Sequence, residues 1–378
     1  MDLVWCEVDT AALRRNMGSF KGLLKPGVRL APAVKSNAYG HGLVLAASAF
    51  LAGGADWLCV NALYEVEALR QAGFTCPLYV MGYLSLEQLE RAVELDARMV
   101  VYNQETVDAL VKLVKRLGKP AYVHIKVETG NNRQGVGLEE ALKLADRCRA
   151  QGVTLEGLAT HFANVEDTTD HRFAEEQLER FERGVRALRG AGHELPICHT
   201  ANSAATLLWP HAQFDLVRVG ISSYGLWPSR ETLLSATLEG RGRTSLTQAL
   251  TWKTRIAQIK RVGVGEFVGY GCTFMATHPT RLAILPVGYY DGYDRGLSNL
   301  AYVLIRGQRA PVRGRVCMNI IMVDVTDIPE ARVEDEVVLL GGQGGQYLSA
   351  EQLGEWSGTI NYEVVARIAD HVPRIARG

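Results

Sequence analysis

The chain has 378 residues, which exceeds the size of one ordinary domain, so we expect two domains. Hydrophobic residues make up 47% of it and charged residues 22%, the balance of a globular protein in water. Its 41 basic and 41 acidic residues give a formal net charge of zero, so no overall charge favours nucleic acid or an anionic membrane surface as a partner.

The sequence carries no pattern of export or membrane insertion. Residues 1–8 lack a basic stretch followed by an apolar one, so we expect no signal peptide. No uncharged apolar run approaches the ~18 residues of a transmembrane helix. The seven cysteines form no C-x-x-C pair, which is typical of free thiols in a reducing cytoplasm. We therefore expect a cytoplasmic protein, and the lone dipeptide Cys198-His199 is too little to predict a metal site.

Residues 25–220 alternate short apolar runs with amphipathic stretches. The apolar runs, each expected to form a strand, are 29–34, 57–61, 77–81, 98–102, 121–127, 154–161, 195–199 and 214–219. Helical patterns lie between most of them, at 63–72, 86–95, 106–117, 138–150 and 173–191. Strand–helix units of this number and spacing predict an α/β fold, a (β/α)₈ TIM-type barrel, with an open doubly wound sheet as the alternative.

The residue pattern of the sequence changes after about residue 235. Strand-like runs separated by Gly, Pro and Asp replace the helical patterns until Glu351, and they are 250–259, 281–287, 302–305, 320–325 and 336–340. We expect the barrel to cover residues 1–235, with the first ten or so packing on the second domain, and a mostly β C-terminal domain to cover 236–378. The glycines of 341–345 predict a hairpin tip, because no lysine follows as in a phosphate-binding loop.

Lys35 directly follows the first apolar run, where a buried strand ends. An amine at such a place does not easily reach water, so its pKa falls and it becomes a nucleophile toward an aldehyde. The polar residues Ser36, Asn37, Tyr39 and His41 crowd the same loop. This pattern predicts a Schiff-base lysine with Tyr39 placed to hold a phosphate. A single lysine in a glycine-rich loop is otherwise most often a surface residue.

Further polar residues fall where the later strands are expected to end, the face on which barrel enzymes carry their chemistry. They are Arg133 after the fifth run, His161 at the end of the sixth, His199, Asn202 and Ser203 after the seventh, and Arg218, Gly220 and Ile221 at the eighth. Each has an ordinary structural explanation, such as a core histidine, an ion-paired arginine or a helix N-cap serine. Their convergence on one face predicts an active site.

The chemistry of these residues is consistent with pyridoxal 5′-phosphate (PLP). Ser203 and the N–H groups of Gly220 and Ile221 are expected to bind its phosphate, and Lys35 its aldehyde. Arg218 is expected to face the pyridine nitrogen. Because arginine keeps its proton, the ring nitrogen would stay unprotonated and withdraw electrons less strongly. That property suits proton exchange better than transamination or decarboxylation.

The chain resembles the bacterial alanine racemases, PLP enzymes of fold type III, over essentially its whole length. The motifs that carry the resemblance stand in family order, at 33–42, 157–163, 199–205, 217–228, 268–271, 286–295, 314–319 and 359–363. The resemblance implies interconversion of L- and D-alanine, which supplies D-alanine for peptidoglycan. It also implies a homodimer whose subunits share their active sites.

By resemblance, two bases act on opposite faces of the substrate Cα. Lys35 handles the proton of the D-enantiomer, and Tyr270 from the second subunit serves the other face. A free tyrosine has a pKa near ~10, so it needs help to act as a base. His161 and Arg218 match the hydrogen-bonded chain that gives this help in the family.

The resemblance also assigns the remaining site residues. Arg133 would orient the substrate carboxylate or the cofactor phenolate, and Met318, next to Cys317, would offer its backbone N–H to the carboxylate. Tyr289 and Tyr362 match tyrosines at the narrow substrate entrance, beside the cofactor. Lys126 matches a lysine that is often carbamylated.

A few positions depart from the family pattern. Asn319 stands where Asp is usual, Glu128 replaces an Asp, and Val219 replaces a Pro. They leave a serine or broad-specificity racemase as the alternative. Arg218 argues against a decarboxylase of the same fold, because that group places an acidic residue at the ring nitrogen. Tyr270 and the second domain argue against a non-catalytic PLP-binding barrel.

Overall fold

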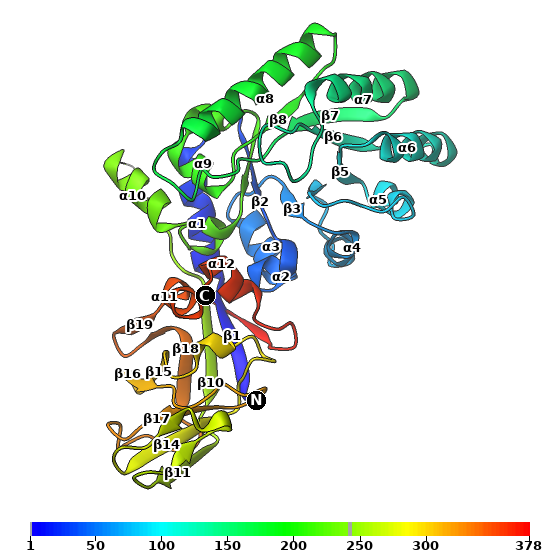
Figure 1. Ribbon diagram of the computed structural model, residues 1–378. Helices are drawn as coiled ribbons and strands as arrows, with labels where there is room; N and C mark the ends of the chain where they lie inside the picture. The colour runs from blue at the N-terminus through cyan, green and yellow to red at the C-terminus, as the bar shows by residue number, and fades with distance from the viewer. Residues whose placement is uncertain (1, 241–243) are drawn as a thin grey trace. The chain divides into compact units, whose positions relative to one another are not determined.

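The computed structural model describes residues 2–240 and 244–378, which divide into two compact units (Figure 1). The barrel unit comprises residues 11–36 and 43–248. The β unit comprises the N-terminal residues up to Thr10, the short segment 37–42 and residues 249–378. The β unit is therefore assembled from three separate stretches of the chain.

The eight predicted strands of the first domain are confirmed. They are β2 (Arg29–Pro32), β3 (Leu58–Val60), β4 (Leu78–Val80), β5 (Ala97–Val101), β6 (Tyr122–Lys126), β7 (Thr154–Ala159), β8 (Ile197–His199) and β9 (Leu216–Val219). In the described part of the barrel unit, β3 to β8 form a parallel sheet in chain order, and β2 pairs in parallel with β9. A bridge between Ala33 and Cys59 joins β2 to β3, and the Arg218 N–H donates to Ala201 O, 2.9 Å away, beyond β8. The strands thus follow one another around a barrel, as expected.

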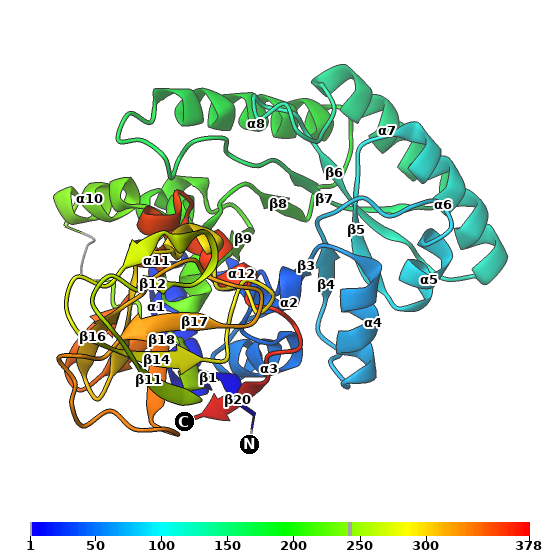
Figure 2. The same ribbon diagram turned by 60° about the horizontal axis from the view of Figure 1, so that its bottom comes forward.

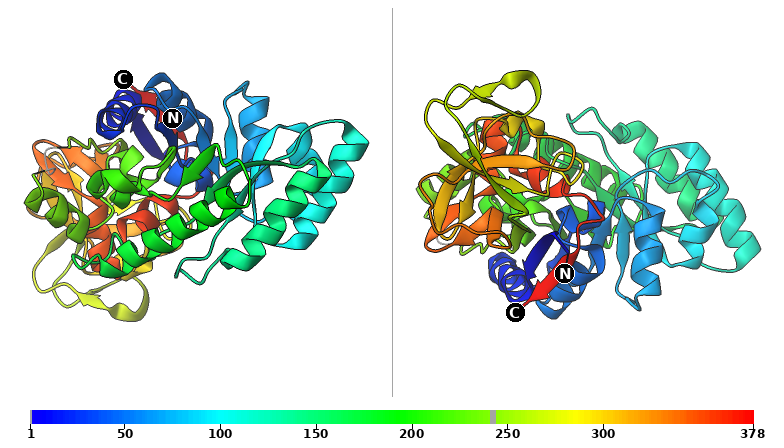
Figure 3. Two further views of the ribbon diagram at one scale, coloured as in Figure 1. Left: turned by 90° about the horizontal axis from the view of Figure 1, so that it is seen from above. Right: turned by 90° about the horizontal axis from the view of Figure 1, so that it is seen from below.

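The five predicted helices are confirmed to within three residues at each end. They are α4 (Leu63–Gln71), α5 (Leu89–Glu94), α6 (Gln104–Leu117), α7 (Leu138–Gln151) and α8 (Arg172–Gly190). Figures 2 and 3 show α4 to α7 in a row along one side of the strands. The solvent-facing side of α8 carries Arg180–Glu176 and Arg186–Glu182 ion pairs at i,i+4 spacing.

Other helices of the barrel unit were not predicted. They are α1 (Thr10–Leu23), which starts at the last residue of the β unit's first segment, α3 (Leu43–Ala52) and α10 (Arg230–Leu238). The helix α9 (Ser203–Leu208) was expected only through its first residue, Ser203. Helix α3 reads LVLAASAFLA, so it has no polar face from which a helical period can be recognised. Of the helices in residues 2–240 and 244–378, none has the length and apolar character needed to cross a bilayer.

The β unit contains three antiparallel or mixed sheets within its described residues. The largest has the order β16 (Gln308–Pro311), β15 (Tyr302–Ile305), β18 (Glu336–Gln343), β10 (Leu250–Arg255), β1 (Val4–Asp9) and β20 (Arg374–Arg377), and β19 (Gln346–Leu348) pairs with β18. The second joins β11 (Gln258–Val262), β14 (Thr280–Leu285) and β17 (Ile321–Asp324), and the third is the hairpin of β12 (Phe267–Val268) and β13 (Phe274–Met275). The helices α11 (Ala350–Ser357) and α12 (Asn361–Ala366) follow.

Two details of this unit bear on the predictions made from sequence. The prediction of one strand over 250–259 was wrong, because β10 and β11 belong to different sheets and the chain leaves the first at Ile256. The predicted hairpin tip is confirmed between β18 and β19. Gly344 and Gly345 adopt φ values of 58° and 83°, which glycine accepts without steric cost.

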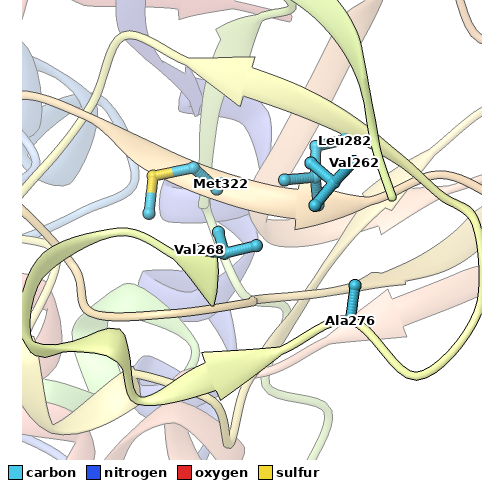
Figure 4. Packing of buried hydrophobic residues seen from close by; sticks show 5 residues of the cluster. All are labelled: Val262, Val268, Ala276, Leu282 and Met322. Atoms are coloured by element: carbon cyan, nitrogen blue, oxygen red, sulfur yellow. The ribbon is translucent and has the colours of Figure 1, made fainter. Parts of the chain in front are cut away.

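A small apolar cluster supports the β12–β13 hairpin on the second sheet. Val262, Val268, Ala276, Leu282 and Met322 are all buried, and their side chains gather between the hairpin and the strands β14 and β17 (Figure 4). The hairpin loop contains Tyr270, which is 73% exposed. The cluster therefore holds the backbone of an exposed tyrosine in place.

The short helix α2 (Lys35–Tyr39) after β2 is left-handed over its last four residues. Ser36, Asn37, Ala38 and Tyr39 have φ between 51° and 55°, a region that costs L-residues roughly 1–2 kcal/mol each. Contacts within the β unit hold it: Arg374 Nε donates to Gly40 O at 2.9 Å, and Asn37 Nδ2 donates to Asp370 Oδ1 at 2.8 Å. At Gly40 itself, φ is 81° and a Cβ would overlap the Val365 carbonyl oxygen. The loop after Lys35 is therefore strained and needs a glycine at this close approach.

We expect Gly40→Ala to destabilise the protein by more than Gly27→Ala. Both glycines have nearly the same φ, 81° and 84°, but a Cβ at Gly27 meets nothing within 4 Å. The control should lose about 1 kcal/mol from the left-handed backbone alone, and the Gly40 variant should lose at least ~2 kcal/mol more from the clash. Urea unfolding followed by circular dichroism measures both, and equal losses would contradict the close contact.

Candidate functional site

The barrel unit brings together most of the polar residues predicted at the strand ends. They are Lys35 after β2, Lys126 at the end of β6, His161 after β7, His199 at the end of β8, Arg218 within β9, and Asn202, Ser203, Gly220 and Ile221 beyond β8 and β9. Arg133 lies in the loop after β6. Because parallel strands end at one rim of a barrel, these side chains share one face. Tyr39, Tyr270, Tyr289, Cys317, Met318 and Tyr362 belong to the β unit.

Lys35 has a half-buried amine that makes no hydrogen bond or ion pair with any residue the structure describes. Burial, and then the positive charge of Arg133, lower the pKa of Lys35 below its usual value. The carboxylate of Glu65, 1% exposed, fixes the backbone beside it by accepting the N–H groups of Ser36 and Asn61, both at 2.6 Å. The result is an amine with raised nucleophilicity on a fixed loop.

Arg218 is a buried cation whose partners are neutral. Nη1 donates one hydrogen to His199 Nδ1, and Nη2 donates to Thr160 O at 2.7 Å and Thr200 O at 2.9 Å. No carboxylate of the described residues lies within 4.0 Å of its guanidinium. Its Nε–H and second Nη1–H also have no acceptor among those residues. Arg218 therefore retains donors for an acceptor from outside the chain.

Lys126 and Arg133 add positive charge to the same face. Burial, followed by the charges of Arg218 and Arg133, lowers the pKa of Lys126 to about 7. The Arg133 side chain is exposed and has no ion pair within the described ranges. A group of cations with so little acidic compensation fits an anionic ligand, such as a phosphate or a carboxylate.

His161 is held next to Arg218. Its Nδ1 lies 3.4 Å from Arg218 Nη2, and burial together with the charge of Arg218 holds the pKa of His161 well below its usual value. An imidazole that is neutral and faces an arginine through Nδ1 carries its proton on Nε2. His161 can therefore donate a hydrogen bond from Nε2.

The residues expected to bind a phosphate meet between α9 and β9. Ser203 Oγ accepts the Gly220 N–H at 2.9 Å, so the serine hydroxyl proton remains to be donated. The Ile221 N–H begins the 3₁₀ turn Ile221–Tyr224, and the first N–H of a turn has no acceptor within it. Ser222 Oγ is buried without a partner among the described residues. The Ser203 hydroxyl, the Ile221 N–H and the Ser222 hydroxyl are donors that suit a phosphate. The Gly220 N–H is not among them, because it donates to Ser203 Oγ.

Asn202, and not Ser203, caps α9. Its Oδ1 accepts the Ala205 N–H at 3.0 Å, and its Nδ2 donates to Glu166 Oε2 at 2.8 Å. The prediction that Ser203 is the N-cap residue was therefore wrong by one residue. Asn202 is well placed to fix the backbone that presents Ser203.

In the β unit the predicted residues form two groups. Tyr39 and Tyr362 lie with ring centroids 6.3 Å apart. Tyr289 N donates to Cys317 O at 3.0 Å, which places Tyr289 beside the segment of Cys317 and Met318. Met318 and Tyr289 are exposed, at 55% and 43%.

Two further residues of the site, Glu65 and His124, were not predicted from the sequence. Glu65 lies on α4, one of the surface helices, where a carboxylate attracts no notice. His124 precedes Lys126 by two residues on β6, so both point to the same side of the strand. That alternation could have identified His124, which is fully buried.

We expect Lys126→Met to flatten the rise of stability with pH. The pKa of Lys126 is about 7 in the folded protein and 10.5 in the unfolded chain. Between these pH values the unfolded chain therefore binds one proton that the folded protein does not bind. Stability contributed by this group therefore rises from pH 7 to about 10.5, and below pH 7 the buried charge destabilises the fold in full.

The measurement is urea unfolding at several pH values in carbon dioxide-free buffer, with the exposed Lys112→Met as the control. Stability curves of wild type and Lys126→Met that run parallel would contradict the lowered pKa.

Two family models match most of this chain. The family model "Alanine racemase, N-terminal domain" matches residues 8–228, and "Alanine racemase, C-terminal domain" matches residues 249–376. The alanine racemase of Desulfovibrio desulfuricans is 42% identical over 373 residues, covering 98% of this chain and 97% of that protein. The alanine racemase of Halothermothrix orenii is 40% identical over 371 residues, covering 98% and 96%.

Solved structures agree. The alanine racemase of Bacillus anthracis with bound L-Ala-P superimposes with a TM-score of 0.93 at 34% identity, covering all of this chain and 96% of that one. The enzyme of a D-cycloserine-producing Streptomyces lavendulae also gives 0.93, at 32% identity and 100% and 98% coverage. The chain therefore belongs to the alanine racemase family and is a racemase of the isomerase class.

Proposed function

We propose that this member of the alanine racemase family interconverts L- and D-alanine, with PLP bound at the carboxyl end of its barrel. The observation that carries the proposal is the half-buried amine of Lys35, which no residue of 2–240 or 244–378 pairs with, on the same face as a buried arginine with N–H groups that those residues do not use. When bound, PLP supplies an electron sink that makes the α-hydrogen of an amino acid acidic. Every other part of the proposed reaction belongs to the side chains of the chain.

The cofactor would be held by its charge and its hydrogen-bonding groups. The phosphate would receive the Ser203 hydroxyl and the Ile221 N–H, with Gly220 and Asn202 positioning Ser203. An unused Arg218 N–H would bond the ring nitrogen and, because arginine does not give up its proton, leave that nitrogen unprotonated. Tyr39 and Tyr362, which lie together, keep their expected roles toward the phosphate and the cofactor.

Two groups would exchange protons with the substrate Cα. In the L-to-D direction, the oxygen of the partner subunit's Tyr270 takes the proton from one face and Lys35 Nζ delivers one to the other. In the reverse direction the two groups exchange roles. The Nε2–H of His161 is available to stabilise the tyrosine oxygen while it is deprotonated. Arg133 would hold the substrate carboxylate, aided by the backbone N–H of the partner subunit's Met318 beside its Cys317.

The surface around Tyr270 supports a homodimer. Phe267, Tyr270, Met275, Met318 and Ile320 are large apolar or aromatic residues that are 43–73% exposed in the single chain. A soluble protein rarely leaves such residues together on its surface unless a partner covers them. A two-fold dimer would bury them and let each subunit lend its Tyr270 to the other. Tyr289 would then line the substrate entrance.

Alanine is the proposed substrate because the relatives and neighbours are alanine racemases. The product would serve peptidoglycan synthesis in the cytoplasm, where the seven free cysteines would remain reduced.

We propose that Lys126 carries a carbamate. Carbamylation needs an uncharged amine, and a pKa of about 7 leaves a large fraction uncharged at pH 8. The new anion would pair with Arg133. With ¹³C-bicarbonate at pH 8, a carbamate carbon signal is expected in the wild type and absent in Lys126→Met. A wild-type spectrum without that signal would exclude the modification.

Mixing two inactive variants tests the shared site. Lys35→Ala and Tyr270→Ala should each lose at least about 10²-fold in activity, the usual effect of removing an acid–base group. If each site uses Lys35 of one subunit and Tyr270 of the other, a hybrid dimer regains one intact site of two. Random re-association of equal amounts should then restore about a quarter of wild-type racemisation.

The control is a mixture prepared without dissociation, which should stay inactive. Failure of the re-associated mixture to gain activity, with dimers formed, would place both residues in one subunit. Unchanged activity of either single variant would remove the two-base proposal altogether.

A further inference from the structure

A row of buried polar side chains leads away from Arg218 through the interior of the barrel. His199 Nδ1 accepts from Arg218, and His199 Nε2 lies 2.8 Å from His124 Nδ1. His124 Nε2 in turn lies 3.0 Å from Glu156 Oε2. Both histidines are fully buried, whereas the Glu156 side chain is 15% exposed and has Arg98 Nε at 3.5 Å. The row therefore joins the proposed cofactor face to a charged pair at the edge of the barrel.

Arg218 at one end of the row can only donate and Glu156 at the other end accepts, so the direction of every hydrogen bond between them is fixed. Arginine has no acceptor, so His199 must accept at Nδ1 and carry its proton on Nε2. That proton is donated to His124 Nδ1, so His124 also carries its proton on Nε2. The carboxylate oxygen of Glu156 accepts it. Burial and the charge of Arg218 hold the pKa of His199 well below its usual value, and burial lowers that of His124, which keeps both rings neutral.

The surroundings are shaped to keep this row closed to water. Tyr79 packs against both rings, with centroids 4.8 Å from His124 and 5.1 Å from His199. A Cβ at Gly157 would overlap His124 Nδ1, so glycine at this point of β7 leaves the space that the ring occupies. Two aligned imidazoles in such a setting transmit orientation from one end of the row to the other.

The row connects the positive charge of Arg218 to a carboxylate. A buried arginine without a counter-charge is costly, and no carboxylate of the described residues reaches Arg218 directly. Glu156 is the carboxylate to which its hydrogen bonds lead. Each neutral ring directs the lone pair of its Nδ1 toward Arg218 and its Nε2–H toward Glu156. The row therefore stabilises the charge of Arg218 without placing a carboxylate next to the cofactor.

We propose that Glu156 is a positioning residue for the racemase reaction, which acts through His124 and His199 to orient the Arg218 guanidinium. This inference rests on the proposed function, because it gives the row the task of leaving the Arg218 Nε–H and second Nη1–H free for the cofactor ring. It is separate from the roles proposed for Lys35 and Tyr270, since Glu156 touches neither substrate nor cofactor.

The first test reads the protons directly and does not need activity. Imidazole ¹⁵N spectra of the protein, with and without PLP, report which ring nitrogen is protonated, and loss of signals in His124→Asn assigns that ring. Neutral His124 and His199 with protons on Nε2 from pH 6 to 8 are expected. A charged ring, or a proton on Nδ1 of His199, would overturn the inference.

The second test compares Glu156→Gln with Asp96→Asn. Both remove a carboxylate bound to Arg98, but it is Glu156, and not Asp96 at 2.6 Å from Arg98 Nη1, that bonds to His124. Asn also tolerates the left-handed φ of 54° at position 96. We expect Glu156→Gln to lower kcat roughly 10-fold at unchanged KM for alanine, the usual scale for a residue that orients a functional group. It should also shift the absorption maximum of bound PLP.

Asp96→Asn should change neither quantity, and Glu156→Asp, which keeps the charge, should fall between wild type and Glu156→Gln. Equal effects of Glu156→Gln and Asp96→Asn, or wild-type kcat and absorbance in Glu156→Gln, would overturn the positioning role. Absence of racemisation in the wild type would instead overturn the proposed function, and the ¹⁵N spectra would still decide whether the row is ordered as inferred.

Discussion

The site depends on positive charge kept at one end of a barrel with little acid to neutralise it. Arg218 is 7% exposed and, among the described residues, bonds only to carbonyl groups and imidazoles, while Lys35 and Lys126 have lowered pKa values on the same face. Such an arrangement costs free energy in the empty protein and is stabilised by an anion that binds there. One constraint thus explains a nucleophilic lysine, a phosphate site and an arginine with unused donors.

A second constraint acts on the loop that follows Lys35. Four successive residues with left-handed φ would not persist without support, and the support comes from residues 365–374, more than 300 positions later in the sequence. Strained backbone of this kind gathers where position matters more than stability. The C-terminal segment therefore contributes to the geometry of a loop that begins at Lys35.

Much of this could be predicted from sequence, for identifiable reasons. The barrel strands are short apolar runs that are buried on both faces, and the rim residues follow them at once, so the order of the chain fixes their place. The exposed face of α8 was equally clear from its Glu–Arg spacing. These features depend on local pattern, which a single sequence contains.

What escaped prediction depends on contacts between distant segments. The left-handed turn needs Arg374 and Asp370, and the break between β10 and β11 arises because each strand pairs in a different sheet. Helix α3 is apolar throughout, so its sequence shows no helical period of polar and apolar residues. Glu65 and Glu156 look like ordinary surface acids until the fold places one under Ser36 and the other beside His124.

The most direct test of the central claim is to locate the cofactor chemically and identify the product in the same preparation. The purified protein would be incubated with PLP, reduced with borohydride and digested, and an untreated portion would be incubated with L-alanine and analysed by chiral chromatography. The account predicts a phosphopyridoxyl group on the Lys35 peptide alone, and D-alanine as the main product. A label on another lysine, or a labelled Lys35 without racemisation of alanine, would contradict it.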